Sequence, residues 1–185
     1  EGDTWIQIDS CDLIIYEMHV RDMTAHPTST AEQKGTYVGL SEAGQNGGIE
    51  HIEAMGVNAV QILPIQDFAN FEVPFKDNKA PLYNDWNPYE RNHWGYMTTF
   101  FFAPESYYAS DGTDIPGRWN GKDGRAVNEI KDMVKAFHKK DIAVIMDVVY
   151  NHVSNYDWNP LKYVDRKRYF RLDENDDYTT HSGCG

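Results

Sequence analysis

Polar side chains gather at the end of an apolar segment, in the run Asp147-Val148-Val149-Tyr150-Asn151-His152-Val153. Side chains alternate along a strand, so we expect Asp147 and Asn151 on one side and His152 on the other until the strand ends. An ionisable group in an apolar strand must be paired or hydrogen-bonded to be tolerated. Asp147 is therefore a candidate for catalysis, or else an anchor for a neighbouring loop. The spacing alone leaves both interpretations open.

A second candidate surface is aromatic. More than half of the aromatic residues fall within 66–122, among them Trp86, Trp94, Tyr96 and Trp119. Aromatic faces flanked by Asp, Asn and Arg suit a ligand with C–H faces and a rim of hydroxyls, which describes a sugar. The alternative is a satellite core beneath a long loop, and we expect it for most of these residues. The three residues Phe100, Phe101 and Phe102 are expected to pack rather than to contact a ligand.

The elements that must position these residues follow from hydrophobic periodicity. Short apolar runs rich in β-branched residues predict buried strands within 12–20, 57–64 and 142–149. Helical spacing of apolar residues predicts helices within 47–56 and 127–137. Strands that alternate with amphipathic helices indicate parallel βαβ units with right-handed crossovers. The predicted class is α/β.

The long segment 66–122 lies between the second strand and the second predicted helix and shows few periodic features. Loops of such length in compact domains are usually functional. In barrels and in open α/β sheets, the loops at the carboxyl ends of strands build the active site. We therefore expect this loop to line a site.

Composition excludes several classes of function. The chain has 185 residues, near the usual size of one domain, with 17 Lys and Arg against 29 Asp and Glu and a net charge of -12. That charge has the wrong sign for nucleic acid or an anionic membrane. The longest apolar runs, 142–146 and 100–103, are far shorter than the roughly 20 residues that span a bilayer. Cys11 and Cys184 have neither disulfide-framework nor metal-ligand spacing. A neutral or cationic ligand fits this chain best.

Four motifs in order resemble glycoside hydrolase family thirteen, the α-amylase superfamily. The run 147–153 resembles the first signature region of that family, at the end of the third strand. The run 56–64 resembles its second strand, and 15–21 resembles its first strand in the debranching branch. Trp94-Gly95-Tyr96 resembles the loop that stacks on substrate.

The resemblance implies a (β/α)8 TIM barrel, a fold that normally needs ~250 residues. This chain supplies three strands, so residues 1–185 are expected to be the N-terminal portion of the catalytic barrel, with 66–122 as a long active-site loop. The first residues are acidic and polar and lack an initiator Met. We therefore expect the chain to start inside a longer gene product or after processing.

The implied activity is hydrolysis of an α-glucan such as starch, glycogen or pullulan with retention of configuration. One carboxylate attacks the anomeric carbon, and a second carboxylic acid protonates the leaving oxygen. In the family these groups follow strands four and five, which would lie beyond Gly185. No catalytic residue is therefore assigned, and the chain alone is expected to be inactive.

The resemblance assigns binding roles instead. His152 would donate a hydrogen bond to a hydroxyl of the glucose being cleaved, Tyr96 would stack beneath that ring, and Trp94 would belong to the same substrate-binding loop. Asp147 would be a buried partner for the Arg near the missing nucleophile. Asn151 would hold the loop or, in calcium-dependent members, offer its carbonyl oxygen to the ion. No cofactor is required, and calcium, which needs roughly six to eight oxygen ligands, has no dedicated loop here.

The motifs define less clearly which glycosidic bond the enzyme would cut. The runs 94–96, 101–105 and 182–185 resemble pullulanase- and isoamylase-type enzymes, which cut α-1,6 links. Common pullulanases have Asp-Pro where this chain has Met97-Thr98, and Asn where it has His93. An α-1,6 debranching activity is favoured, and an α-1,4-acting amylase or glucanotransferase relative is the alternative.

Two alternative interpretations assign the chain to other functional classes. One is a carbohydrate-binding fragment that uses the aromatic loop without catalysis. The other is an unrelated α/β enzyme that uses Asp147 and His152 with a metal. In addition, a three-stranded piece of a barrel leaves unpaired backbone groups on its outer strands. We therefore expect self-association, domain swapping or marginal stability of the isolated chain.

Overall fold

A computed structural model describes residues 3–69, 92–112, 123–154 and 159–179. The chain forms two compact units. Unit 1 comprises Glu1–Ile65 and Ala103–Asp147, and unit 2 comprises Gln66–Phe102 and Val148–Gly185.

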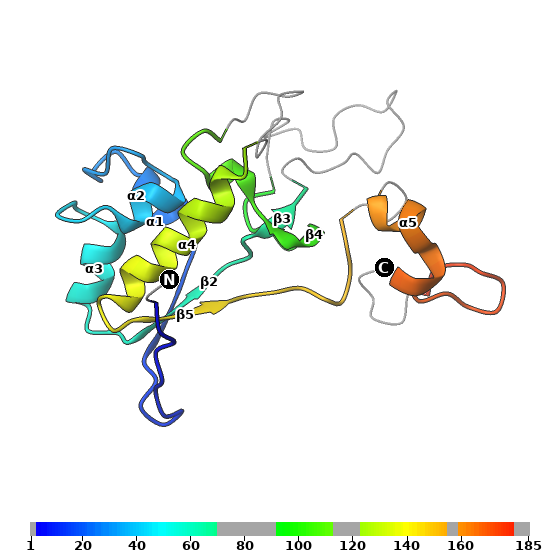
Figure 1. The fold of residues 1–185 in the computed structure, drawn as a ribbon, viewed down its shortest axis with the longest axis horizontal. Coiled ribbons are helices and arrows are strands. Elements are labelled where there is room, and N and C mark those ends of the chain that lie inside the picture. The colour runs from blue at the N-terminus through cyan, green and yellow to red at the C-terminus, as the bar shows by residue number, and fades with distance from the viewer. Residues whose placement is uncertain (1–2, 70–91, 113–122, 155–158, 180–185) are drawn as a thin grey trace. The chain divides into compact units, whose positions relative to one another are not determined.

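Unit 1 contains a parallel three-stranded sheet with the order β1-β2-β5 (Figure 1). Its strands are β1 (Ile15–Met18), β2 (Ala59–Ile62) and β5 (Ala143–Met146). Ala59 of β2 is in register with Ile15 on one side and with Ala143 on the other. The three predicted strands and their parallel pairing are confirmed, and so is the mixed α/β class.

Helices connect these strands as the periodicity predicts. After β1 the chain forms α1 (Asp22–Ala25), α2 (Tyr37–Ser41) and α3 (Gly48–Ala54), and α4 (Arg125–His138) precedes β5. Gly56 has a φ of 74°, which suits the predicted residue just past the end of a helix. The short helices α1 and α2 were not predicted, because neither is long enough to show helical periodicity.

The core of unit 1 lies between the sheet and the helices. Helix α4 contacts α2, α3 lies against α2, and β5 lies beside α4. Helix α4 buries Ala126 and Met133, whereas Val127 is exposed. Several large side chains are completely inaccessible to solvent: Tyr37, Leu40, Ile52, Ile62, Met133 and Phe137. Each buried aliphatic side chain contributes roughly 1.5–3 kcal/mol, so this cluster dominates the stability of unit 1.

The strands are shorter and more exposed than the sequence predicts. Strand β1 was expected to be buried on both faces, yet Ile15 is 48% exposed. The reason is that β1 lies at an edge of the described sheet. Strand β5 ends at Met146, so the alternation predicted for Asp147, Asn151 and His152 does not extend to these residues. The Asp147 amide still donates to the Ile62 carbonyl (3.0 Å), which closes the ladder.

The predicted long loop 66–122 contains regular structure. Strands β3 (Gln66–Phe68) and β4 (Thr98–Pro104) pair with each other, and the 3-10 helix η1 (Ser106–Tyr108) follows. The Thr- and Phe-rich sequence of β4 has high β propensity. The expectation that Phe100 to Phe102 would all pack is wrong for Phe102, which is 104% exposed, because alternation along β4 directs Phe100 and Phe102 to the same exposed face.

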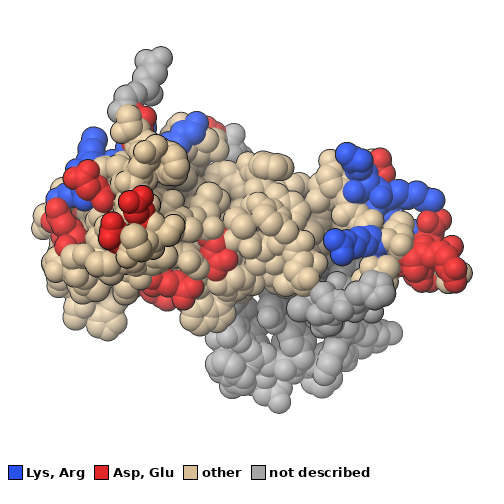
Figure 2. All heavy atoms as spheres, turned by 90° about the horizontal axis from the view of Figure 1, so that it is seen from below, with Lys and Arg blue, Asp and Glu red and all other residues tan. Residues whose placement is uncertain are grey.

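Unit 2 also contains α5 (Pro160–Tyr169), which Asn159 caps by accepting from the Leu161 amide. The last turn of α5 is basic, and an acidic turn follows it. Figure 2 shows blue and red atoms side by side in this region, and Lys167 forms an ion pair of 3.2 Å with Asp176. The positive charge of α5 is therefore partly neutralised locally. None of the described helices combines the length and the apolar character needed to span a bilayer.

The outer strands generate a prediction about association. Within the described residues, β1 and β5 have one neighbour each, and Ile15 on β1 is half-exposed. Edge strands with unpaired backbone groups can pair with strands of other chains. A charged side chain on such a strand prevents this pairing. We expect the isolated chain to self-associate with rising concentration, and Ile15→Lys to reduce this association, as measured by sedimentation velocity.

The matched control is Val164→Lys, which places the same charge on an exposed position of α5. It should leave the association unchanged. A wild-type chain that remains monomeric at every concentration would contradict the prediction.

Candidate functional site

Two of the predicted site residues meet in unit 2. The Nε2 atom of His152 lies 2.7 Å from the main-chain oxygen of Tyr96, although 56 positions separate them in the chain. Both residues are half-buried. The carbonyl can only accept, so the ring nitrogen Nε2 carries the proton that is donated. The Nδ1 atom of the same ring is 3.4 Å from Nδ2 of the Asn151 side chain. The two contacts fix the orientation of the imidazole.

The position of His152 depends on β4. The amide of Ser154 donates to the Thr98 carbonyl (2.8 Å), and the hydroxyls of Ser154 and Thr99 lie 2.9 Å apart. Ser154 is buried, so these hydrogen bonds are shielded from water. They attach the segment after β5 to the start of β4, which follows Tyr96 by two residues. This attachment brings His152 to Tyr96.

The turn before Tyr96 is built by an Asn and a Gly. The amide of Gly95 donates to the side-chain oxygen of Asn92, three residues earlier (3.1 Å), which closes the turn. Gly95 has a φ of 78°, a conformation that favours glycine. The turn orients Trp94, whose side chain is 58% exposed and packs edge-on against His93 with ring centroids 5.0 Å apart. Trp94 therefore offers an aromatic surface to solvent beside Tyr96.

The aromatic residues divide between core and surface. Phe68 and Tyr108 are buried, as expected for a satellite core. Tyr150 is exposed, and its ring lies 5.5 Å from that of Phe101. Sequence reasoning did not select Tyr150 as a candidate, although it precedes Asn151 directly within the quoted motif. The predicted aromatic positions Trp86, Tyr89 and Trp119 lie outside the described residues.

The predicted residues are divided between the two units. Asp147 is the last residue of unit 1, whereas Trp94, Tyr96, Asn151 and His152 belong to unit 2. The role of Asp147 as partner of an Arg near the nucleophile therefore stays a prediction. Within the described residues, neither Asp147 nor His152 belongs to a group of three or more His, Cys, Asp or Glu ligands. Calcium binding through Asn151 also stays a prediction.

A titratable carboxyl lies on the strand next to β4. Asp67, the middle residue of β3, is largely removed from water, and this burial raises the pKa of its carboxyl from 3.8 to about 6. Burial disfavours the charged form of an acid. The stability of this part of unit 2 should therefore depend on pH.

The sign of that dependence follows from linkage. Between pH 3.8 and about 6, the carboxyl is ionised in the unfolded chain and protonated in the folded one, so stability falls as the pH rises through this window. Asp67→Asn keeps the side chain neutral. We expect the variant to lose this decline and to melt at a higher temperature than the wild type at neutral pH, measured by circular dichroism.

Asp9→Asn, which removes a carboxylate from an exposed position, is the matched control. It should follow the wild-type pH profile. Parallel melting curves for the wild type and Asp67→Asn from pH 4 to pH 7 would show the prediction to be wrong.

No family model matches the chain. The chain is 36% identical over 193 aligned positions to "Isoamylase 1, chloroplastic" of Arabidopsis thaliana, covering 100% of this chain and 22% of that protein. It is 34% identical over 169 positions to the pullulanase of Bacillus subtilis, covering 88% of this chain and 21% of that protein.

Solved structures give the same result. The pullulanase from an Anoxybacillus species matches with a TM-score of 0.75 and 35% identity, covering 100% of this chain and 24% of that one. The pullulanase from Paenibacillus barengoltzii, solved in complex with maltohexaose and α-cyclodextrin, matches with a TM-score of 0.77 and 31% identity, covering 100% and 27%. The chain spans about a fifth of the length of the curated relatives it matches. These matches confirm the resemblance that the four motifs predict.

Proposed function

Because this chain is a homologue of the isoamylases and pullulanases over its whole length, we propose that it is part of an α-glucan hydrolase of the debranching type and binds α-glucan through Tyr96, Trp94 and His152. The observation that carries the proposal is the 2.7 Å contact between His152 and the Tyr96 carbonyl. It joins the two residues to which the resemblance assigns substrate contacts.

The chemistry of the pair suits a sugar. A half-buried Tyr ring can stack on the C–H face of a glucose, and its electron-rich face favours the positive charge that develops on the ring during cleavage. His152 has a donor at Nε2, and a glucose hydroxyl that takes the place of the Tyr96 carbonyl would accept from it. Asn151 holds the other side of the ring, so the donor is already oriented. Binding would therefore exchange one acceptor for another at a ring whose orientation is already set.

The fold supports a barrel. Three consecutive strands lie side by side in parallel, with α3 and α4 in the crossovers, as in the first part of a (β/α)8 barrel. The relatives are about five times longer than this chain, consistent with further strands elsewhere in the protein. We therefore place the nucleophile and the general acid outside these 185 residues. A preference for α-1,6 links is supported by the names of the relatives, isoamylase and pullulanase.

Binding of maltotriose tests the proposed site. We expect Tyr96→Ala and His152→Ala each to raise the Kd of the chain for maltotriose by about tenfold, because each removes a contact of about 1.4 kcal/mol. Isothermal titration calorimetry measures the change. Tyr163→Ala, which removes an exposed Tyr from α5, is the matched control and should bind like the wild type. Equal affinities of all four proteins would contradict the assigned roles.

An activity assay tests whether the chain binds α-glucan without cleaving it. We expect no release of reducing sugar from pullulan or starch by the purified 185-residue chain, because the carboxylates that attack and protonate the bond are absent from it. A reducing-sugar assay over long incubation makes the measurement. Release that Asp147→Asn abolishes would show that the chain carries its own catalytic residue.

A further inference from the structure

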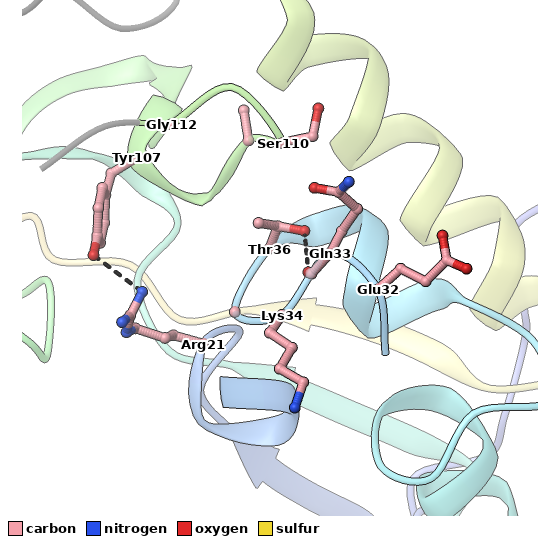
Figure 3. Close-up of a pocket in the computed structure, with 10 residues that line it drawn as sticks. Arg21, Glu32, Gln33, Lys34, Thr36, Tyr107, Ser110 and Gly112 are labelled. Carbon is pink, nitrogen blue, oxygen red and sulfur yellow. Dashed lines mark hydrogen bonds between the residues drawn. The ribbon is translucent and has the colours of Figure 1, made fainter. Parts of the chain in front are cut away.

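Unit 1 has a polar pocket of about 480 Å³ that is built from two loops (Figure 3). The first loop follows β1 and supplies Arg21 and the run 32–36. The second includes the end of η1 and supplies Tyr107, Ser110 and Gly112. Both loops belong to unit 1, and no sequence pattern grouped these residues into one site. The volume falls within the roughly 300–1,000 Å³ of small-molecule sites.

One wall of the pocket is an Arg–Tyr pair. The guanidinium of Arg21 donates from Nη1 to the Tyr107 hydroxyl (3.0 Å), and its carbon lies 5.7 Å from the centre of the Tyr107 ring. Arg21 lies against Gly35, where an added Cβ would be 3.2 Å from the Arg21 Cγ atom and 3.3 Å from Nη1. Arg21 has further N–H donors for a ligand after its bond to Tyr107.

This wall is fixed from inside unit 1. The carboxylate of Glu105, which is fully buried, accepts from the Tyr107 amide at 2.6 Å. The next residue, Tyr108, is also buried, and its hydroxyl lies 2.9 Å from Nε2 of His19. Tyr37 donates from its hydroxyl to the Glu105 carbonyl (2.8 Å). The backbone that carries the Tyr107 ring is thus held in place before any ligand arrives.

The opposite wall offers both donors and acceptors. Figure 3 shows Arg21 and Tyr107 on one side of Thr36, and Gln33 and Ser110 on the other. The Ser110 hydroxyl donates to Glu129 (2.5 Å), so its oxygen remains able to accept. The side-chain amide of Gln33 has no hydrogen bond within the described residues, and its exposed side chain can donate and accept.

The balance of charge indicates a neutral ligand. Arg21 and Glu32, which carry opposite charges, both line the pocket. Lys34 lines the pocket too, but its amine donates to the Pro27 carbonyl (3.2 Å) and is directed away from the space between the walls (Figure 3). A phosphate beside Ser110 would lie close to the Glu129 carboxylate that accepts from the Ser110 hydroxyl. Vicinal hydroxyls, each of which donates and accepts, match this mixed set of groups.

We propose that this pocket is a second α-glucan-binding site, which holds a short stretch of glucan between the Tyr107 ring and the Gln33 and Ser110 side chains. The choice of α-glucan among sugars rests on the function proposed above. The residues of this pocket belong to unit 1, whereas Tyr96, Trp94 and His152 belong to unit 2.

The experiment isolates the pocket by removing the other site. The Tyr96→Ala chain is titrated with maltotriose, and Tyr107→Ala or Gln33→Ala is then added to it. We expect the Tyr96→Ala chain to retain one binding event, and each added substitution to raise its Kd by about tenfold. Tyr163→Ala in the same background is the control. Gln33 is exposed, so its substitution tests the pocket even if Tyr107→Ala unfolds the chain, which the melting temperature reports.

The outcomes separate this proposal from the proposed function. If Tyr96→Ala alone abolishes maltotriose binding, the second site is wrong and the first stands. If Tyr107→Ala and Gln33→Ala abolish binding while Tyr96→Ala has no effect, the second site stands and the first is wrong. Displacement of maltotriose from the Tyr96→Ala chain by inorganic phosphate would show an anion site and overturn this inference. Absence of binding to the wild type would overturn both.

Discussion

Strand β2 is hydrogen-bonded along both of its edges, and the rest of unit 1 is arranged around that pairing. Ala59, Val60 and Ile62 are completely buried. The ladder continues just past the strands, where the Leu63 amide donates to the Met18 carbonyl (2.9 Å) and the Asp147 amide to the Ile62 carbonyl. The segments after β1 and β5 leave the sheet at this carboxyl edge, where loops of α/β proteins carry functional residues. The central strand thereby determines where the chain can place polar groups.

Outside that sheet, a few side chains replace regular pairing. The segment that carries Asn151 and His152 has no strand in the described residues, and it is positioned by the bonds of Ser154 to Thr98 and Thr99. In the pocket of unit 1, the buried carboxylate of Glu105 likewise positions a neighbouring segment, because it accepts from the Tyr107 amide. Buried polar groups of this kind are costly unless satisfied, so each one specifies a single arrangement of its neighbours.

The features that depend on local sequence patterns were predicted correctly. The strands and the helices α3 and α4 follow from periodicity, and His152 and Tyr96 from their motifs. The features that depend on a residue's neighbours in space were not predictable from the sequence. Burial of β1 was overestimated because an edge strand and a central strand have the same apolar pattern. The pocket was missed because Arg21 and Tyr107, which form its wall, are 86 positions apart, so no local pattern joins them.

Tyr96 takes part in the site through two chemically independent groups. Its main-chain oxygen orients His152, and every amino acid provides that oxygen. Its ring alone depends on the identity of the residue. Under the proposed function, replacement of the ring by Phe, Trp or His would alter sugar affinity, while the main-chain oxygen that holds His152 in the unliganded chain is retained. The proposed substrate contact could then be tuned, by natural variation or by engineering, independently of the architecture that supports it.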